Sequence, residues 1–157
     1  MKRRIAEKLQ STYNEELLAA RYGQLPMVQL LLDYGAAVDV AHCSSQLSVM
    51  CQAVRSGNLE LIRTLLPYLR HRQKRDELSL ALFPAAARGR VDILKFLIDH
   101  GADVNHQYTG EYYPKSYNPY TIICTLTPLI YTIINNQRAA HDLLIAHGAT
   151  YTPLCTP

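Results

Sequence analysis

A pair of amphipathic segments recurs four times along this chain. In each pair, a short segment rich in alanine and aliphatic residues ends at a glycine or an asparagine, and a second apolar segment follows a few residues later. Apolar residues in the second segments recur at the three- and four-residue spacing of a helix, so each pair predicts two helices joined by a tight turn. The first segments end at Gly23, Gly57, Gly89 and Asn136, and the second segments cover residues 27–32, 61–66, 93–98 and 139–145.

The spacing between the copies is close to constant. Gly23 and Gly57 are 34 residues apart, and Gly57 and Gly89 are 32 apart. Gly35 and Gly101 are separated by 66 residues, which is two periods of 33. A fixed period near 33 residues predicts a solenoid of stacked helix pairs, and such stacks typically work as binding surfaces.

Several residues carry a resemblance to the ankyrin repeat. Residues 127–130 read Thr-Pro-Leu-Ile and resemble the family's Thr-Pro-Leu-His opening, in which Thr127 can cap the helix and Pro128 suits its first position. The alanine pairs at 19–20 and 85–86 match the small residues of the family's inner helix. Residues 101–105 read Gly-Ala-Asp-Val-Asn and match the family's exit from the outer helix.

The resemblance covers about residues 13–150 and implies an all-α ankyrin-repeat solenoid with four helix–turn–helix repeats. We expect one domain over residues 1–157, with a short N-terminal cap helix, one long inserted finger rich in tyrosine and an irregular tail. The expected bounds are 1–12 for the cap, 13–37, 47–69, 79–102 and 126–149 for the repeats, 107–122 for the insertion and 150–157 for the tail.

Three positions depart from the repeat pattern. Pro67 stands near the end of the second outer helix, which should therefore end early or distort. Pro84 lies in the third inner helix, where we expect it near the helix start. Gly101 and Gly148 are 47 residues apart, which is 14 more than one period and marks the insertion.

Composition and charge narrow the class of protein. A hydrophobic content of 48% is ordinary for a folded soluble domain, and the net charge is only +3. No apolar stretch approaches the ~20 residues that span a bilayer, and the basic N-terminus is not followed by the apolar run of a signal peptide. The four cysteines form no paired motif, so we expect a reduced, cytoplasmic protein in which Cys51 is a small buried hydrophobe.

The sequence carries no recognisable catalytic or metal-binding motif. The six histidines are scattered, and none combines with acidic residues or cysteines in the spacing of a metal site or a nucleophilic centre. We therefore expect no enzyme activity, no cofactor and no metal.

Arginines mark the first candidate binding surface. The resemblance implies that residues just before each glycine turn face a concave groove, and this places Arg21 with Tyr22, Arg55 and Arg88 along one stripe. The planar guanidinium can bond both oxygens of a carboxylate, so the stripe predicts a groove for an acidic or mixed protein segment. Arg72, Lys74 and Arg75 extend this surface in the expected finger at 70–75. The alternative is a solvated basic face with acidic residues interspersed.

The tyrosine-rich insertion is the second candidate surface. Tyrosine is enriched at interface hot spots, and Tyr108, Tyr112, Tyr113 and Tyr117 fall in this segment. Alternatively, the insertion folds over the last inner helix and covers its apolar surface at Ile134. Both readings can hold together, with the isoleucines at 122–123 packed and some tyrosines presented to a partner.

Asn105 is a candidate modification site. Leu97, followed after five residues by Asp-Val-Asn at 103–105, resembles the ankyrin sequence recognised by the asparaginyl hydroxylase that modifies these repeats. The alternative is structural, because aspartate and asparagine side chains commonly stabilise turns through hydrogen bonds to the backbone.

Together these observations favour a monomeric, non-catalytic module that binds another protein. One alternative is an effector or adaptor that an intracellular bacterium or a virus delivers into a host cell. A second is a nucleic-acid binder that uses the basic finger, which the modest charge and the missing recognition motif disfavour. A third is the substrate-recruiting part of a larger enzyme.

Overall fold

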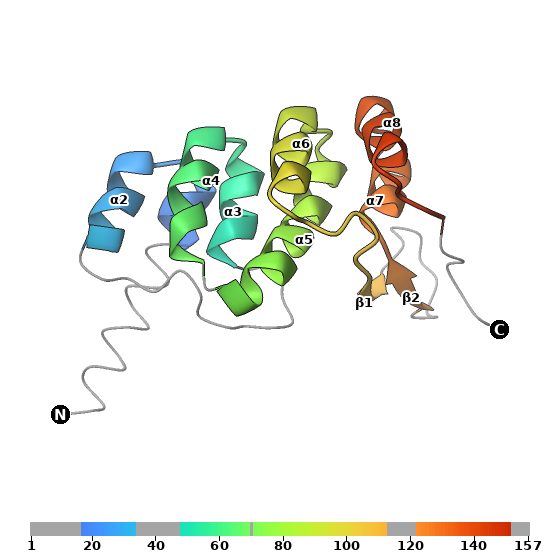
Figure 1. Cartoon of the computed structure of the whole chain (residues 1–157), viewed down its shortest axis with the longest axis horizontal. Coiled ribbons are helices and arrows are strands. Elements are labelled where there is room, and N and C mark those ends of the chain that lie inside the picture. Colours follow the sequence, from blue (N-terminus) through green and yellow to red (C-terminus); the bar gives the residue numbers. More distant parts are fainter. Residues whose placement is uncertain (1–16, 34–47, 70, 113–121, 152–157) are drawn as a thin grey trace.

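Helix pairs stand side by side in a single row (Figure 1). This computed structural model describes residues 17–33, 48–69, 71–112 and 122–151. Residues 17–21 are the described part of the first inner helix. The expected ankyrin solenoid is confirmed. Its other helices are α2 (Leu25–Asp33), α3 (Val49–Ser56), α4 (Leu59–Leu65), α5 (His71–Ala87), α6 (Val91–Asp99), α7 (Pro128–Ile134) and α8 (Arg138–Ala146). The predicted N-terminal cap and most of the predicted tail lie outside the described residues.

Each tight turn between paired helices adopts the left-handed conformation that the sequence predicts. The φ angle is 67° at Gly23, 78° at Gly57 and 63° at Gly89. Asn136 takes the fourth turn with a φ of 54°, and asparagine is among the few other residues that tolerate this region. Side chains also cap helices here, since Asn58 Oδ1 accepts from the Leu61 N–H at 3.2 Å at the start of α4. The prediction that the Thr127 side chain caps the helix is wrong, because its hydroxyl makes no capping hydrogen bond to α7.

The core runs along the row between neighbouring repeats. Ala53 and Ala85 on the inner helices are fully buried, and their small side chains let those helices pack closely. Ile62 and Leu94 on the outer helices are likewise buried. Cys51 belongs to this core as predicted, and burial raises the pKa of its thiol to about 11. The thiol therefore stays protonated and packs as an apolar group.

The connection between the second and third repeats differs from the predicted finger. The α4 helix ends early as expected, and a short 3-10 turn at Leu66–Tyr68 contains Pro67. The α5 helix then begins at His71 instead of at 79, so Arg72, Lys74 and Arg75 lie in its first turns. Pro84 consequently lies well inside α5, and the prediction that it stands near the helix start is wrong. The helix extends this far because Leu78, Ala81 and Leu82 recur at helical spacing and are fully buried.

The inserted finger contains a β-hairpin, which is the one pair of strands among the described residues of this otherwise helical stack. Strand β1 (Tyr108–Tyr112) pairs antiparallel with β2 (Ile122–Leu126), and the hairpin lies at the foot of α7 (Figure 1). Its base packs on the stack through a small cluster in which Phe83, Leu126 and Ile130 are buried. Apolar contact with α5 and α7 therefore fixes where the hairpin leaves the solenoid.

Candidate partner-binding surfaces

Two of the three predicted stripe arginines meet directly. The Arg88 guanidinium donates a hydrogen bond to the backbone carbonyl of Arg55, which lies 33 residues earlier in the chain. Arg55 is half-buried, whereas Arg88 and Arg21 are exposed. Arg21 occupies the position of Arg55 in the first repeat, and its neighbour Tyr22 is 72% exposed. This surface, formed by Arg21, Tyr22, Arg55 and Arg88, is called the arginine row below.

Contacts between successive turns hold the arginine row in register. The residue after each turn lies over the glycine of the preceding turn. Asn58 Nδ2 donates to the carbonyl of Gly23 at 3.2 Å. A methyl group added at Gly57 would lie 2.7 Å from Nη2 of Arg90, and one at Gly89 would meet Gln137. Sequence reasoning missed these bridging side chains, although their constant place directly after each turn was a usable signal.

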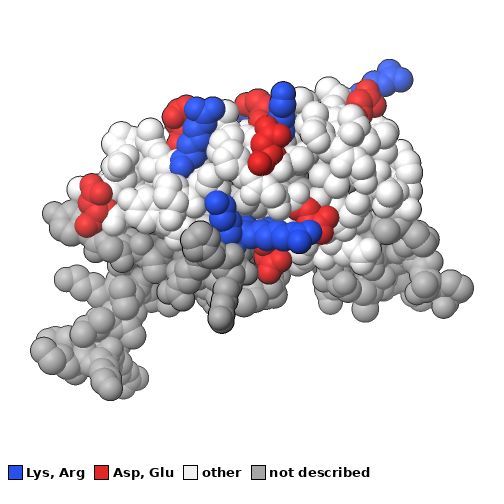
Figure 2. Space-filling view, in the orientation of Figure 1, with Lys and Arg blue, Asp and Glu red and all other residues white. Residues whose placement is uncertain are grey.

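The basic segment at the start of α5 is partly engaged within the molecule. Arg75 Nη2 lies 3.3 Å from Asp103 Oδ2 in an exposed ion pair. Lys74 is half-buried. On the face drawn in Figure 2, Lys and Arg groups alternate with Asp and Glu groups, and the described residues form no extended patch of one sign there. This alternation of charges favours the alternative of a solvated basic face over that of a basic finger that is free to bind a partner.

Of the four candidate tyrosines in the insertion, one packs on the stack and two lie outside the described residues. Tyr108 is half-buried, and its ring lies 6.1 Å from that of Phe83 in an edge contact, so it supports the hairpin base. Tyr112 ends β1, while Tyr113 and Tyr117 lie outside the described residues. Ile134 remains 46% exposed, so the predicted covering of this residue is wrong. The hairpin instead packs against Ile130, one turn earlier on α7.

Asn105 joins the turn after α6 to the end of α8. Its Oδ1 accepts hydrogen bonds from the Thr150 N–H at 2.8 Å and from Thr150 Oγ1 at 3.2 Å. Its Nδ2 donates to the carbonyl of Gly148 at 3.0 Å, and its own N–H donates to Asp103 Oδ1 at 2.9 Å. These contacts support the structural reading of the residue, and hydroxylation of Asn105 stays a prediction.

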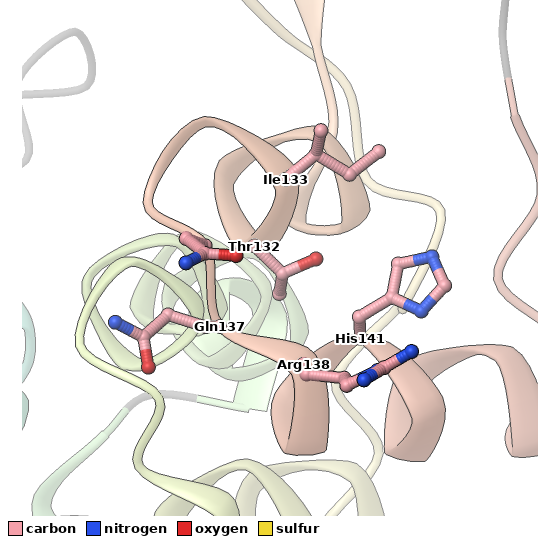
Figure 3. Close-up of a pocket in the computed structure, with 6 residues that line it drawn as sticks. Thr132, Ile133, Gln137, Arg138 and His141 are labelled. Carbon is pink, nitrogen blue, oxygen red and sulfur yellow. The ribbon is translucent and has the colours of Figure 1, made fainter.

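A pocket that sequence reasoning missed lies on the fourth repeat. It has a volume of about 340 Å³ and is lined by Thr132, Ile133, Asn136, Gln137, Arg138 and His141 (Figure 3). His141 is held from two sides, since its Nε2 lies 2.7 Å from Tyr151 Oη and its Nδ1 lies 3.2 Å from Asp142 Oδ1. Arg138 and His141 both project from the first turns of α8, below Ile133 of α7 (Figure 3).

Among the residues that the structure describes, no group of three histidine, cysteine or acidic side chains lies close enough to hold a metal ion. None of the described helices is long and apolar enough to cross a membrane.

The family assignment rests on a match to the model of ankyrin repeats (3 copies), which covers residues 17–108. This segment is more than half of the chain and spans the first three helix pairs. The chain belongs to the ankyrin-repeat family. Members of this family are generally non-catalytic modules for protein–protein interaction.

A curated relative points in the same direction. The chain is 39% identical over 85 residues to a protein of fowlpox virus (strain NVSL) that is named as an ankyrin repeat protein. The match covers 54% of this chain and 15% of the viral protein, so this chain corresponds to a small part of that relative.

Proposed function

We propose that this ankyrin-repeat chain is a monomeric module that binds an acidic segment of another protein along the arginine row. The observation that carries the proposal is the contact of the Arg88 guanidinium with the Arg55 carbonyl, because it places the cationic group of one repeat beside an arginine of the preceding repeat. The bridging side chains after each turn fix the spacing, so less freedom is lost when a partner binds. Tyr22 adds an exposed aromatic surface beside Arg21.

The proposal is tested by replacing Arg21, Arg55 and Arg88 together with alanine. We expect the affinity for the main partner captured from cell lysate to fall at least tenfold, which corresponds to about 1.4 kcal/mol. Binding is measured by isothermal titration calorimetry with the purified partner. A triple lysine variant keeps the charge and loses the planar fork, so its affinity should lie between those of the alanine variant and the wild type.

A control variant tests whether binding depends on the arginine row or on positive charge in general. Replacing Arg63 and Lys95 with alanine removes two exposed cations from the outer helices α4 and α6. This variant should bind like the wild type. Equal losses in both variants, or no loss in the triple alanine variant, would reject the arginine row as the binding surface and direct attention to the tyrosine-rich hairpin.

The similarity to the fowlpox virus protein favours a second candidate, in which the chain is an effector or adaptor that acts on a host protein inside the cytoplasm of an infected cell. Parallel captures from lysates of fowl cells and of bacteria test this idea. A partner found only in the fowl lysate supports it, and the absence of a selective partner there contradicts it.

A further inference from the structure

The fourth repeat ends the described stack with an uncovered face. Counting from each tight turn, Ile133 occupies the position held by Ala20, Val54 and Ala86 in the three earlier repeats. Those three residues have no exposed surface because the next inner helix covers them, whereas Ile133 is 53% exposed. In the second and third repeats the next inner helix packs against the inner helix, α5 on α3 and α7 on α5, whereas none of the described helices packs on this face of the fourth repeat.

On this face, polar side chains replace aliphatic ones at two equivalent positions. Arg138 stands where the earlier repeats have Leu25, Leu59 and Val91, and His141 stands where they have Val28, Ile62 and Leu94. The latter three are fully buried. These two replacements, with Ile133, give the pocket one apolar wall and one polar wall on which Arg138 carries a positive charge.

The wall formed by Arg138 and His141 faces away from the stack. Arg138 and His141 point to the same side in Figure 3, whereas Gln137 points to the opposite side, where it meets Gly89 of the preceding repeat. Tyr151 and Asp142 already hold both nitrogens of the His141 ring. Arg138 is exposed and forms no ion pair with any of the residues that the structure describes. A carboxylate of a partner would therefore form its ion pair with Arg138.

We propose that the end face of the fourth repeat docks a helix of a partner protein that carries a carboxylate opposite Arg138 and an apolar side chain over Ile133. This helix takes the place that the inner helix of a next repeat would occupy. Charge selects the occupant, because the outer-helix position of Arg138 is aliphatic in the three earlier repeats. An acidic helix therefore gains an ion pair here that a repeat-like apolar helix does not. The site is distinct from the arginine row and does not depend on it.

The rival explanation is that Arg138 and His141 only keep the exposed end of the described stack soluble, since a polar outer face has this role in repeat proteins. A solubilising role needs no particular ligand. A docking site, by contrast, predicts selective binding whose charge preference can be inverted.

The test is selection of helical peptides from a phage-displayed library against the 157-residue chain. We expect enriched peptides to carry Glu or Asp three or four residues from Leu, Ile or Met. The affinity of the best peptide should fall at least tenfold with Arg138→Glu and at least threefold with Ile133→Ser. Replacing the peptide's acid with lysine should restore binding to Arg138→Glu and weaken binding to the wild type.

Matched control variants test whether the peptide binds at the end face of the fourth repeat and not elsewhere on the chain. Arg63→Glu reverses an exposed arginine on α4 and should leave peptide binding unchanged, as should the triple alanine variant of the arginine row. Circular dichroism and thermal unfolding confirm that each variant is folded. The proposal is overturned by three results: no enriched acidic helix, binding insensitive to Arg138→Glu, or sedimentation showing that Arg138 mediates self-association, which would make a second copy the occupant.

Discussion

Asn105 links two loops that lie more than forty residues apart in the sequence, since its partners Gly148 and Thr150 are 43 and 45 residues away. Its amide uses both its donor and its acceptor in these contacts. At a residue scale, its side chain makes three hydrogen bonds between the third and fourth repeats. Its role is therefore to hold the fourth repeat, with its pocket and hairpin, against the third.

Replacing Asn105 with alanine should lower the free energy of unfolding by about 1–2 kcal/mol, because three side-chain hydrogen bonds of modest individual worth are lost. Urea denaturation followed by circular dichroism measures the change. Asn135→Ala is the matched control, since Asn135 Nδ2 donates only to the Tyr131 carbonyl within α7. Equal destabilisation by the two variants would show that the bridge between the repeats contributes nothing beyond a local contact.

At the scale of elements, the start of α5 is coupled to the turn after α6. The hydroxyl of Ser79 donates to the Arg75 carbonyl at 2.6 Å and accepts from the Asp103 N–H at 2.8 Å. Ser79 is fully buried, whereas the Arg75–Asp103 ion pair is exposed. The buried hydroxyl, and not the basic charge, should therefore be the stronger link between these elements.

A comparison of Ser79→Ala with Arg75→Ala tests this ranking. The serine variant leaves a buried N–H without its acceptor and should cost about 1–3 kcal/mol. The arginine variant removes an exposed ion pair and should cost less than about 1 kcal/mol. Chemical denaturation of both variants gives the two values. A larger cost for Arg75→Ala would mean that the ion pair, and hence the charge of the segment, holds the connection.

The elements also show how far the sequence could predict this molecule. Helix pairs and turns were predictable because apolar spacing and left-handed glycines are local signals that repeat. The start of α5 was missed because the charges at 71–77 resembled a loop, although Leu78, Ala81 and Leu82 continue a helical stripe. The hairpin was missed despite the β-branched residues of 122–126. The pairing of Asn105 with Thr150 depends on how two repeats stack, which no local pattern carries.

At the scale of the whole molecule, the stack offers a side surface with the arginine row and an end surface with the pocket of the fourth repeat. The net charge of the chain is only +3, and acidic groups are interspersed among the basic ones on the face in Figure 2. A nucleic-acid binder instead concentrates cations along a phosphate track, because release of counterions supplies most of its non-specific affinity. This distribution fits short acidic protein segments better than a polyanion.

The charge distribution predicts weak binding to nucleic acid. A random-sequence DNA duplex of about 20 base pairs, followed by fluorescence anisotropy at about 150 mM salt, should show no saturation below about 100 μM protein, the weak end of non-specific binding. Lowering the salt should produce at most shallow binding, because basic and acidic groups alternate among the described residues on the face in Figure 2. Micromolar affinity that falls steeply with salt would contradict this expectation and revive the basic segment of α5 as a phosphate-binding surface. The Arg75→Ala variant then decides the site: a shallower salt dependence would assign the contact to α5, and an unchanged one would assign it to the arginine row.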